Sequence, residues 1–281
     1  MKLVRYGEPN LEKPGILDSR GQLRDLSNVI PDLNGAALSD ASLERLRQID
    51  LETLPIVTGN PRVGACISGV GKFICIGLNY RQHAVETGAS IPTEPILFLK
   101  ATSSIGGAND DIIIPRGSIK TDWEVELGVV IGKPVKYVTK EFALEYVAGY
   151  CVINDLSERE YQLERGGQWD KGKGCDTFGP IGPYLVTRDE IPDPQALKLW
   201  LEVDGQRYQD SSTADMIFGV AEIVAYLSQF FTLHPGDVIS TGTPQGVGLG
   251  MKPPRYLGAG QTMHLGIDGL GEQRQIAVND S

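Results

Sequence analysis

The sequence has few residues of the kinds that form disulfide frameworks or bind soft metals. Its four cysteines, Cys66, Cys75, Cys151 and Cys175, form no Cys-x-x-Cys pair, and only three histidines occur among 281 residues. A chain of this length can bury a core without such staples, so free thiols in a reducing compartment are expected. MKLVRYGEPN at the start lacks the apolar segment of a secretory signal. We therefore expect a cytoplasmic protein.

Long apolar runs, basic clusters and common cofactor motifs are also missing. No apolar run approaches the ~18 residues of a membrane-spanning helix. Lys and Arg total 26 against 36 Asp and Glu, a net charge of −10, which disfavours binding to nucleic acid or an anionic membrane. Gly-x-Gly-x-x-Gly, Gly-x-Ser-x-Gly and His-Glu-x-x-His do not occur. Nucleotide-dependent and serine-hydrolase functions therefore lose their usual support.

Glycine is abundant, at 34 residues, which favours tight turns over a helical bundle. Asp204-Gly205 predicts a two-residue hairpin, and apolar residues at helical spacing predict one long helix over 216–231. Strand and helix do not alternate regularly, so a doubly wound or TIM-type fold is disfavoured. Further strands are predicted over 72–80, 95–100, 111–115, 123–132, 146–155 and 197–209.

The first sixty residues predict a small N-terminal domain. Short strand candidates, KLVRY, GILDS and QLRDL, precede a short helix that Ser39 or Asp40 can cap. TGNPR at 58–62 is a plausible hinge. We therefore expect an N-terminal domain over 1–62 and a catalytic domain over 63–281.

Acidic residues form the most informative pattern. Glu124 and Glu126 alternate with apolar residues and would share one face of a strand, separated by a rise of roughly 6.5–7 Å. Asp155 ends the apolar run GYCVIN, where a buried carboxylate needs a partner. If the three acids converge, their oxygen ligands favour Mg²⁺, or else Mn²⁺ or Ca²⁺, over zinc. The alternatives are a solvated strand face for the two glutamates and a turn or N-cap role for Asp155.

Other polar residues have both functional and ordinary interpretations. His83 and Glu86, three apart, would form either a general-base pair or a surface pair. Lys173 in a glycine-rich loop could stabilise an oxyanion or face solvent. Arg159 and Gln162 could bind a substrate carboxylate and oxo group, or form the polar face of a helix. The loop TGTPQGVG, residues 241–248, could bind an anionic group or be a strained turn.

Five segments occur in one order: GLNYRQHAVETG, DWEVELGVVIG, GYCVINDLSEREYQ, KGKGCDTFGPIGP and TGTPQGVG. This series resembles the fumarylacetoacetate hydrolase family over roughly residues 70 to 275. The branch it resembles most includes bacterial 2,4-diketo-3-deoxy-sugar-acid hydrolases and acylpyruvate hydrolases. The resemblance implies a β-rich α+β fold, with a mixed β-roll or sandwich-like catalytic domain, a small N-terminal appendage and a homodimer.

The resemblance also implies roles for single residues. Thr177 would lie near the metal, and Ile76 stands where the animal tyrosine-pathway enzyme has a further Asp ligand, which makes fumarylacetoacetate a doubtful substrate. The remaining implied roles are metal binding by Glu124, Glu126 and Asp155, with Mg²⁺ or Mn²⁺; water activation on a lid by His83 with Glu86; oxyanion stabilisation by Lys173; and substrate contact by Arg159, Gln162 and Thr243.

The expected reaction is hydrolysis of the C3–C4 bond of a 2,4-diketo acid to pyruvate and a second carboxylic acid. The substrate would be a 2,4-diketo-3-deoxy sugar acid, such as the fuconate or rhamnonate derivative, or an acylpyruvate. Ureidoglycolate lyase and oxaloacetate decarboxylase are alternatives that use the same metal–enolate chemistry. A non-catalytic metal-binding module is a third possibility, which the His83–Glu86 pair and Lys173 disfavour.

Overall fold

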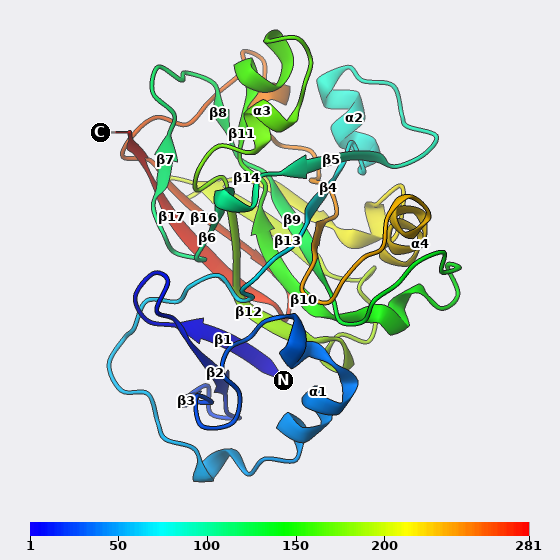
Figure 1. The fold of residues 1–281 in the computed structure, drawn as a ribbon. Coiled ribbons are helices and arrows are strands. Elements are labelled where there is room, and N and C mark those ends of the chain that lie inside the picture. Colours follow the sequence, from blue (N-terminus) through cyan, green and yellow to red (C-terminus); the bar gives the residue numbers. More distant parts are fainter. Residues whose placement is uncertain (281) are drawn as a thin grey trace.

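The computed structural model describes residues 1–280. Two β-sheets dominate it and only four α-helices occur in the described chain, so the predicted β-rich α+β fold is confirmed (Figure 1). The large sheet has the order β3 (Leu23–Asp25), β2 (Lys13–Leu17), β1 (Lys2–Tyr6), β12 (Gly179–Thr187), β10 (Val147–Asn154), β9 (Val125–Ile131), β15 (Val238–Ser240), β4 (Phe73–Gly77) and β5 (Ile96–Lys100), with β6 (Ile105–Gly106) paired to β12.

A second sheet of five strands has the order β14 (Gln206–Ser212), β13 (Lys198–Val203), β16 (Thr262–Ile267), β17 (Gly271–Asn279) and β7 (Ile112–Ile114), and β8 (Thr121–Asp122) pairs with β11 (Ser157–Glu158). The helices are α1 (Asp40–Arg47), α2 (Arg81–Thr87), α3 (Asp170–Lys173) and α4 (Val220–Phe230). A π-helical turn covers Glu160–Glu164, and 3₁₀ turns cover Gly35–Leu38, Leu51–Thr53, Thr102–Ser104, Ala143–Tyr146, Arg188–Glu190, Thr213–Asp215 and Gly248–Gly250. No helix in the described part of the chain is both long and apolar enough to span a membrane.

The central strands β9 and β10 are buried along their whole length. Val129 and Val152 pack in a core shared with the five-stranded sheet and α4. Val130 and Ile153, on the opposite face, pack in a second core shared with the N-terminal segment. Burial on both faces explains why these strands are apolar nearly throughout, and it shows that the alternative of a solvated face on β9 is wrong.

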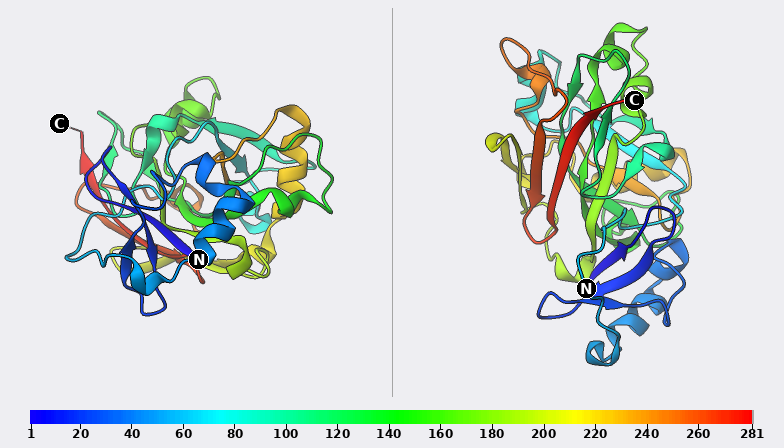
Figure 2. Two further views of the ribbon diagram at one scale, coloured as in Figure 1. Left: turned by 60° about the horizontal axis from the view of Figure 1, so that its bottom comes forward. Right: turned by 90° about the vertical axis from the view of Figure 1, so that its left-hand side faces the viewer.

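The N-terminal segment extends the large sheet, because β1 pairs antiparallel with β12. It forms one end of the molecule (Figure 2). Ser39 caps α1 as the sequence suggested, since its hydroxyl oxygen accepts a hydrogen bond from the Ser42 amide. The boundary at residue 62 stays a prediction.

Two sequence predictions near the site have different outcomes. The hairpin at Asp204-Gly205 is confirmed: both residues have positive φ, 50° and 77°, as a type I′ turn requires. The long helix begins at Val220 and not at 216. Asn79 is the reason, because its backbone oxygen and side-chain oxygen accept hydrogen bonds from the Ile217 and Phe218 amides and hold that segment outside the helix.

Candidate active site

Three buried carboxylates meet at one end of the β9–β10 pair. Glu126 lies in β9, Glu124 immediately precedes that strand, and Asp155 immediately follows β10. The strands run antiparallel, and the Asp155 amide donates to the Glu124 carbonyl oxygen at 2.9 Å. This pairing brings one oxygen from each carboxylate within 4.8 Å of the others. The three acids therefore converge, as the hypothesis of a metal site requires.

Cationic side chains surround two of these acids. Lys173 Nζ contacts Glu124 Oε2 and lies 2.8 Å from Asp155 Oδ2. Lys100 Nζ lies 2.6 Å from Asp155 Oδ1, and Arg159 lies 2.7 Å from Glu124 Oε1. The sequence argument missed Lys100, although it ends the apolar stretch PILFLK as Asp155 ends its own. A charged residue at the end of a buried strand was therefore an available signal.

The third acid is in a different electrostatic position. Burial opposes ionisation of Glu124, but the charges of Lys173 and Arg159 lower its pKa to about 2. Burial, with the neighbouring Asp155 and Glu124, raises the pKa of Glu126 well above its usual value. Glu126 is held instead by neutral donors, the Ser240 hydroxyl at 2.6 Å and the Gly242 amide at 2.7 Å.

The three carboxylates fit a hard divalent cation as metal ligands. All three offer carboxylate oxygens, which Mg²⁺, Mn²⁺ and Ca²⁺ prefer. A cation would also offset the repulsion among charges held this close in a buried site. Glu124, Glu126 and Asp155 are thus a suitable ligand set by their chemistry and their proximity.

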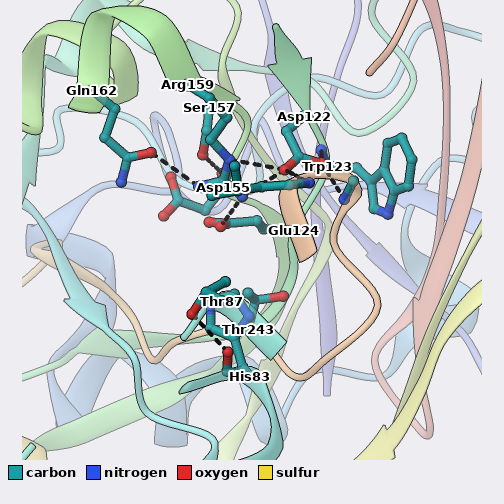
Figure 3. A network of polar contacts seen from close by, with 12 residues as sticks. His83, Thr87, Asp122, Trp123, Glu124, Asp155, Ser157, Arg159, Gln162 and Thr243 are labelled. Atoms are coloured by element: carbon teal, nitrogen blue, oxygen red, sulfur yellow. Dashed lines mark hydrogen bonds and ion pairs between the residues drawn. The ribbon is translucent and has the colours of Figure 1, made fainter. Parts of the chain in front are cut away.

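His83 and Glu86 form a pair on α2. His83 Nδ1 lies 2.9 Å from Glu86 Oε1, an interaction that leaves Nε2 as the basic nitrogen when Nδ1 carries the proton. His83 is buried and faces the carboxylates across an open space (Figure 3). The Gly246 amide donates to Glu86 Oε2 at 2.9 Å and so helps to hold the Glu86 carboxylate in place. The interpretation as a surface pair is wrong for His83, because its ring lines the cavity.

The loop over residues 241–248 and its continuation bind the chain's own carboxylates. The amides of Gly242 and Gly246 hold Glu126 and Glu86, and the Gly248 amide donates to Asp122 Oδ1 at 2.7 Å. A Cβ at Gly248 would lie 1.8 Å from a backbone oxygen, so this approach requires glycine. The sequence argument left open an anion site here. Within the described chain, these amides serve internal acids.

Arg159 and Gln162 lie in the cavity wall together (Figure 3). Arg159 donates from Nε to Asp122 Oδ2 at 2.8 Å and from Nη1 to Gln162 Oε1 at 3.0 Å. Asp122, wholly buried, therefore orients Arg159 and anchors the Gly248 loop at once. The sequence alone assigned no role to Asp122, so this one was missed.

Two further predicted residues have different positions. Thr243 lines the cavity, but its hydroxyl donates to the Val125 carbonyl oxygen at 3.0 Å and accepts from Gln209 at 2.8 Å. Thr177 does not line the cavity; its hydroxyl oxygen accepts a hydrogen bond from the Ile113 amide at 2.9 Å and borders a separate depression. This bond ties the Thr177 hydroxyl to β7, and a place near the metal stays a prediction for this residue.

The sequence matches a known family over most of its length. Residues 72–278 match the family described as Fumarylacetoacetate (FAA) hydrolase C-terminal. The chain belongs to the fumarylacetoacetate hydrolase family. Members of this family are enzymes that include hydrolases, and the family resemblance predicted from the five segments is confirmed.

Individual proteins agree with this family assignment. A Burkholderia multivorans protein that carries a provisional hydrolase name is 67% identical over 277 residues, which are 98% of each chain. A fumarylacetoacetate hydrolase from Exiguobacterium antarcticum is 34% identical, with a TM-score of 0.88 over 100% of both chains. A Sphingobium maleylpyruvate hydrolase, solved with manganese(II) and pyruvate, is 24% identical and shares the fold, with a TM-score of 0.83 over 100% of both chains.

Proposed function

We propose that this protein is a Mg²⁺-dependent, or Mn²⁺-dependent, hydrolase that cleaves the C3–C4 bond of a 2,4-diketo acid. The products are pyruvate and a second carboxylic acid. The observation that carries the proposal is the meeting of Glu124, Glu126 and Asp155 opposite the His83–Glu86 pair. The manganese and pyruvate bound to the Sphingobium maleylpyruvate hydrolase support a metal and a pyruvate-like product. A homodimer in the cytoplasm is part of the same proposal.

The site would use the cation for one purpose. Glu124, Glu126 and Asp155 would hold a divalent ion, which would serve as a Lewis acid for the oxo group and for negative charge on the pyruvate half. The protein's own residues do the remaining work. Arg159, fixed by Asp122 and Gln162, presents its charge at the cavity wall, where it favours the substrate's C1 carboxylate.

His83 is placed to start the reaction. With Nδ1–H donated to Glu86, Nε2 can take a proton from a water molecule. The resulting hydroxide attacks the C4 carbonyl, and Lys173, with Gln162, stabilises the oxyanion. The C3–C4 bond then breaks, its electron pair goes to the pyruvate enolate, and protonation at C3 gives pyruvate. The C4 fragment leaves as the carboxylic acid that contains the water oxygen.

The alternatives differ in their need for water. A ureidoglycolate lyase or an oxaloacetate decarboxylase requires the acidic site but no base that activates water. The His83–Glu86 pair, in which His83 is buried and the Gly246 amide donates to Glu86, favours the hydrolase. A non-catalytic module would not need that pair or the buried Lys173.

A direct test is to incubate the purified protein and Mg²⁺ with acylpyruvates, deoxy-diketo sugar acids, oxaloacetate and ureidoglycolate. A coupled assay would detect pyruvate, and a second assay would detect glyoxylate from ureidoglycolate. In H₂¹⁸O, the proposed reaction places one ¹⁸O in the non-pyruvate acid. Glyoxylate from ureidoglycolate, or pyruvate from oxaloacetate alone, would overturn the hydrolase in favour of the corresponding alternative.

A further inference from the structure

Much of the cavity lining beyond the acids is apolar. Phe98 and Trp169 meet edge to face with ring centroids 5.5 Å apart, and Leu78, Leu163 and Leu249 also line the cavity. We name these five side chains the apolar wall. Leu78 adopts a positive φ of 51°, which is strained for a leucine. Strain of this kind is retained where the surroundings over-determine it, as at ligand-binding sites.

The position of Trp169 depends on the strand next to it. Gly77 ends β4, and a Cβ there would lie 2.4 Å from Trp169 Cζ3. The missing side chain lets the indole ring approach the strand and close this side of the cavity. The tryptophan is therefore seated against the backbone as a fixed surface.

Apart from the Gln162 amide nitrogen and His83 Nε2, which the proposed reaction uses, the polar groups of the cavity lining bond to other groups of the protein. The hydroxyl of Thr87 donates to the His83 carbonyl oxygen at 2.9 Å, and that of Thr243 donates to the Val125 carbonyl oxygen. The cations Arg159 and Lys173 form ion pairs with the buried acids. A substrate chain rich in hydroxyls, or one that ends in a carboxylate, would meet on the described lining only polar groups that are paired within the protein or used by the proposed reaction, so it would lose water at a considerable cost.

The cavity is also small. Its volume of about 180 Å³ lies below the ~300–1,000 Å³ that is typical of pockets for larger ligands. The pyruvate half, held at the acids, would occupy part of this space. Only a short group can follow it.

From these observations we infer that the site selects 2,4-diketo acids whose group beyond C4 is short, uncharged and mainly apolar. The apolar wall is the specificity determinant. This inference rests on the proposed function and narrows it: alkyl acylpyruvates and deoxy-diketo acids that end in a methyl group fit, whereas polyhydroxylated and dicarboxylic analogues do not.

The first test compares three probes of matched chain length in the presence of Mg²⁺: 2,4-dioxoheptanoate, its 5,6,7-trihydroxy derivative and 2,4-dioxoheptanedioate. We expect kcat/KM to be at least about tenfold higher for the alkyl acid, the lower bound for a mismatch in an apolar pocket. Equal or higher kcat/KM for either polar probe would overturn the inference and leave the hydrolase intact. If no probe releases pyruvate, the proposed function fails. Calorimetric affinities that do not favour the alkyl acid would then overturn the inference separately.

The second test changes the wall itself. Leu163 is 43% exposed, so Leu163→Arg can place a cation at the wall without burying it, and Leu163→Met is the matched apolar control. The arginine should raise the ratio of kcat/KM for 2,4-dioxoheptanedioate to kcat/KM for 2,4-dioxoheptanoate about tenfold. This is the effect expected of one charge-assisted hydrogen bond. Methionine should preserve the preference of the natural protein. The Leu163→Arg variant should keep the native circular dichroism spectrum and still turn over 2,4-dioxoheptanoate. If the kcat/KM ratio of the two probes is nevertheless unchanged, the role of the wall is overturned.

Discussion

Two clusters of charged side chains in this molecule differ in how their charges are ordered. The first joins the N-terminal segment to the rest of the chain, and we call it the junction cluster. It forms an alternating chain of acids and bases, Asp32–Arg5–Glu12–Arg62–Asp110, with contacts of 2.7, 3.4, 2.9 and 2.6 Å. Each arginine lies between two acids, so opposite charges offset one another within the protein.

The second cluster, in the cavity, places like charges together. Glu124, Glu126 and Asp155 have oxygens within 4.8 Å of one another. Lys100, Arg159 and Lys173 pair with the first and third of these acids, while Glu126 has no ion pair in the described chain. In the junction cluster, the alternating acids and bases neutralise one another within the protein. In the cavity, the three acids lie so close together that a bound divalent cation would offset their repulsion. The predictions below test whether function and stability separate along this line.

The largest effect should come from Glu126→Gln. The amide oxygen can still accept from Ser240 and Gly242, but a metal ligand with full charge is lost. We expect kcat/KM to fall by at least about 10³, and Mg²⁺ affinity to fall with it, because the Lewis acid contributes several kcal/mol.

The same variant should not lower the urea midpoint of the metal-free protein, because it removes a repulsion among acids. Glu222→Gln, at a side chain of α4 that is 40% exposed, is the control and should leave turnover and the midpoint as they are. Full turnover by Glu126→Gln in excess chelator would show that the acids are not metal ligands.

His83→Ala should lower kcat by roughly 10²–10⁴, the usual contribution of a general base. His264→Ala is a matched control, because His264 also lies 2.7 Å from a glutamate, Glu272, but on β16 and outside the cavity lining. Steady-state kinetics on a saturating diketo acid would measure both. A raised KM with kcat unchanged in His83→Ala would point to a binding role for the ring.

Arg62→Ala changes the junction cluster, and it should lower stability while leaving turnover unchanged, the reverse of what we expect for the cavity variants. It removes the contacts to Glu12 and Asp110, and a half-buried double pair should contribute about 1–3 kcal/mol to the free energy of unfolding, between exposed and buried pairs. Turnover per folded molecule should stay unchanged. Arg20→Ala, at a 71% exposed side chain 3.7 Å from Glu52, is the control and should change stability by less than about 1 kcal/mol. Loss of turnover with stability intact in Arg62→Ala would contradict the comparison.

The same contrast explains what the sequence could predict. The three acids were identifiable because each interrupts or ends an apolar strand, and the strand pairing that joins them follows from the fold of the family. The junction cluster was not identifiable, since Arg5 lies in the strand β1, whereas Glu12, Arg62 and Asp110 lie in connecting segments, and no local pattern indicates which charges will meet.

Other roles depend on contacts distant in sequence. Asp122 meets the Gly248 amide 126 residues later, and Asn79 alters the start of α4 from 139 residues away. The Thr177 hydroxyl likewise accepts a hydrogen bond from the Ile113 amide 64 residues away, a contact that no local pattern predicts. Local propensity and motif order predict elements and ligand types, but they do not fix which hydroxyls and amides are already satisfied by distant groups.

The smallest effect should appear where the N-terminal helix meets the catalytic body, at Arg47 and Asp189, 2.9 Å apart. Partial burial opposes ionisation of Asp189, but hydrogen bonds from Arg47 and Thr187 lower its pKa to about 2. A lowered pKa stabilises the fold above the ordinary value near 4, and this contribution is lost as pH falls toward 2. The side chain is 45% exposed, so solvent screening keeps the contribution below about 1 kcal/mol.

Asp189→Asn should therefore be less stable than the natural protein at pH 5 and nearly equal to it at pH 2. Urea denaturation at the two pH values measures the difference, and 1 M NaCl at pH 5 should shrink it, because salt screens an exposed pair. A gap of the same size at pH 2 and pH 5 would show that Asp189 contributes through packing and not through charge. The contact between Arg47 and Asp189 would then stabilise the protein by packing, and its charges would contribute nothing measurable.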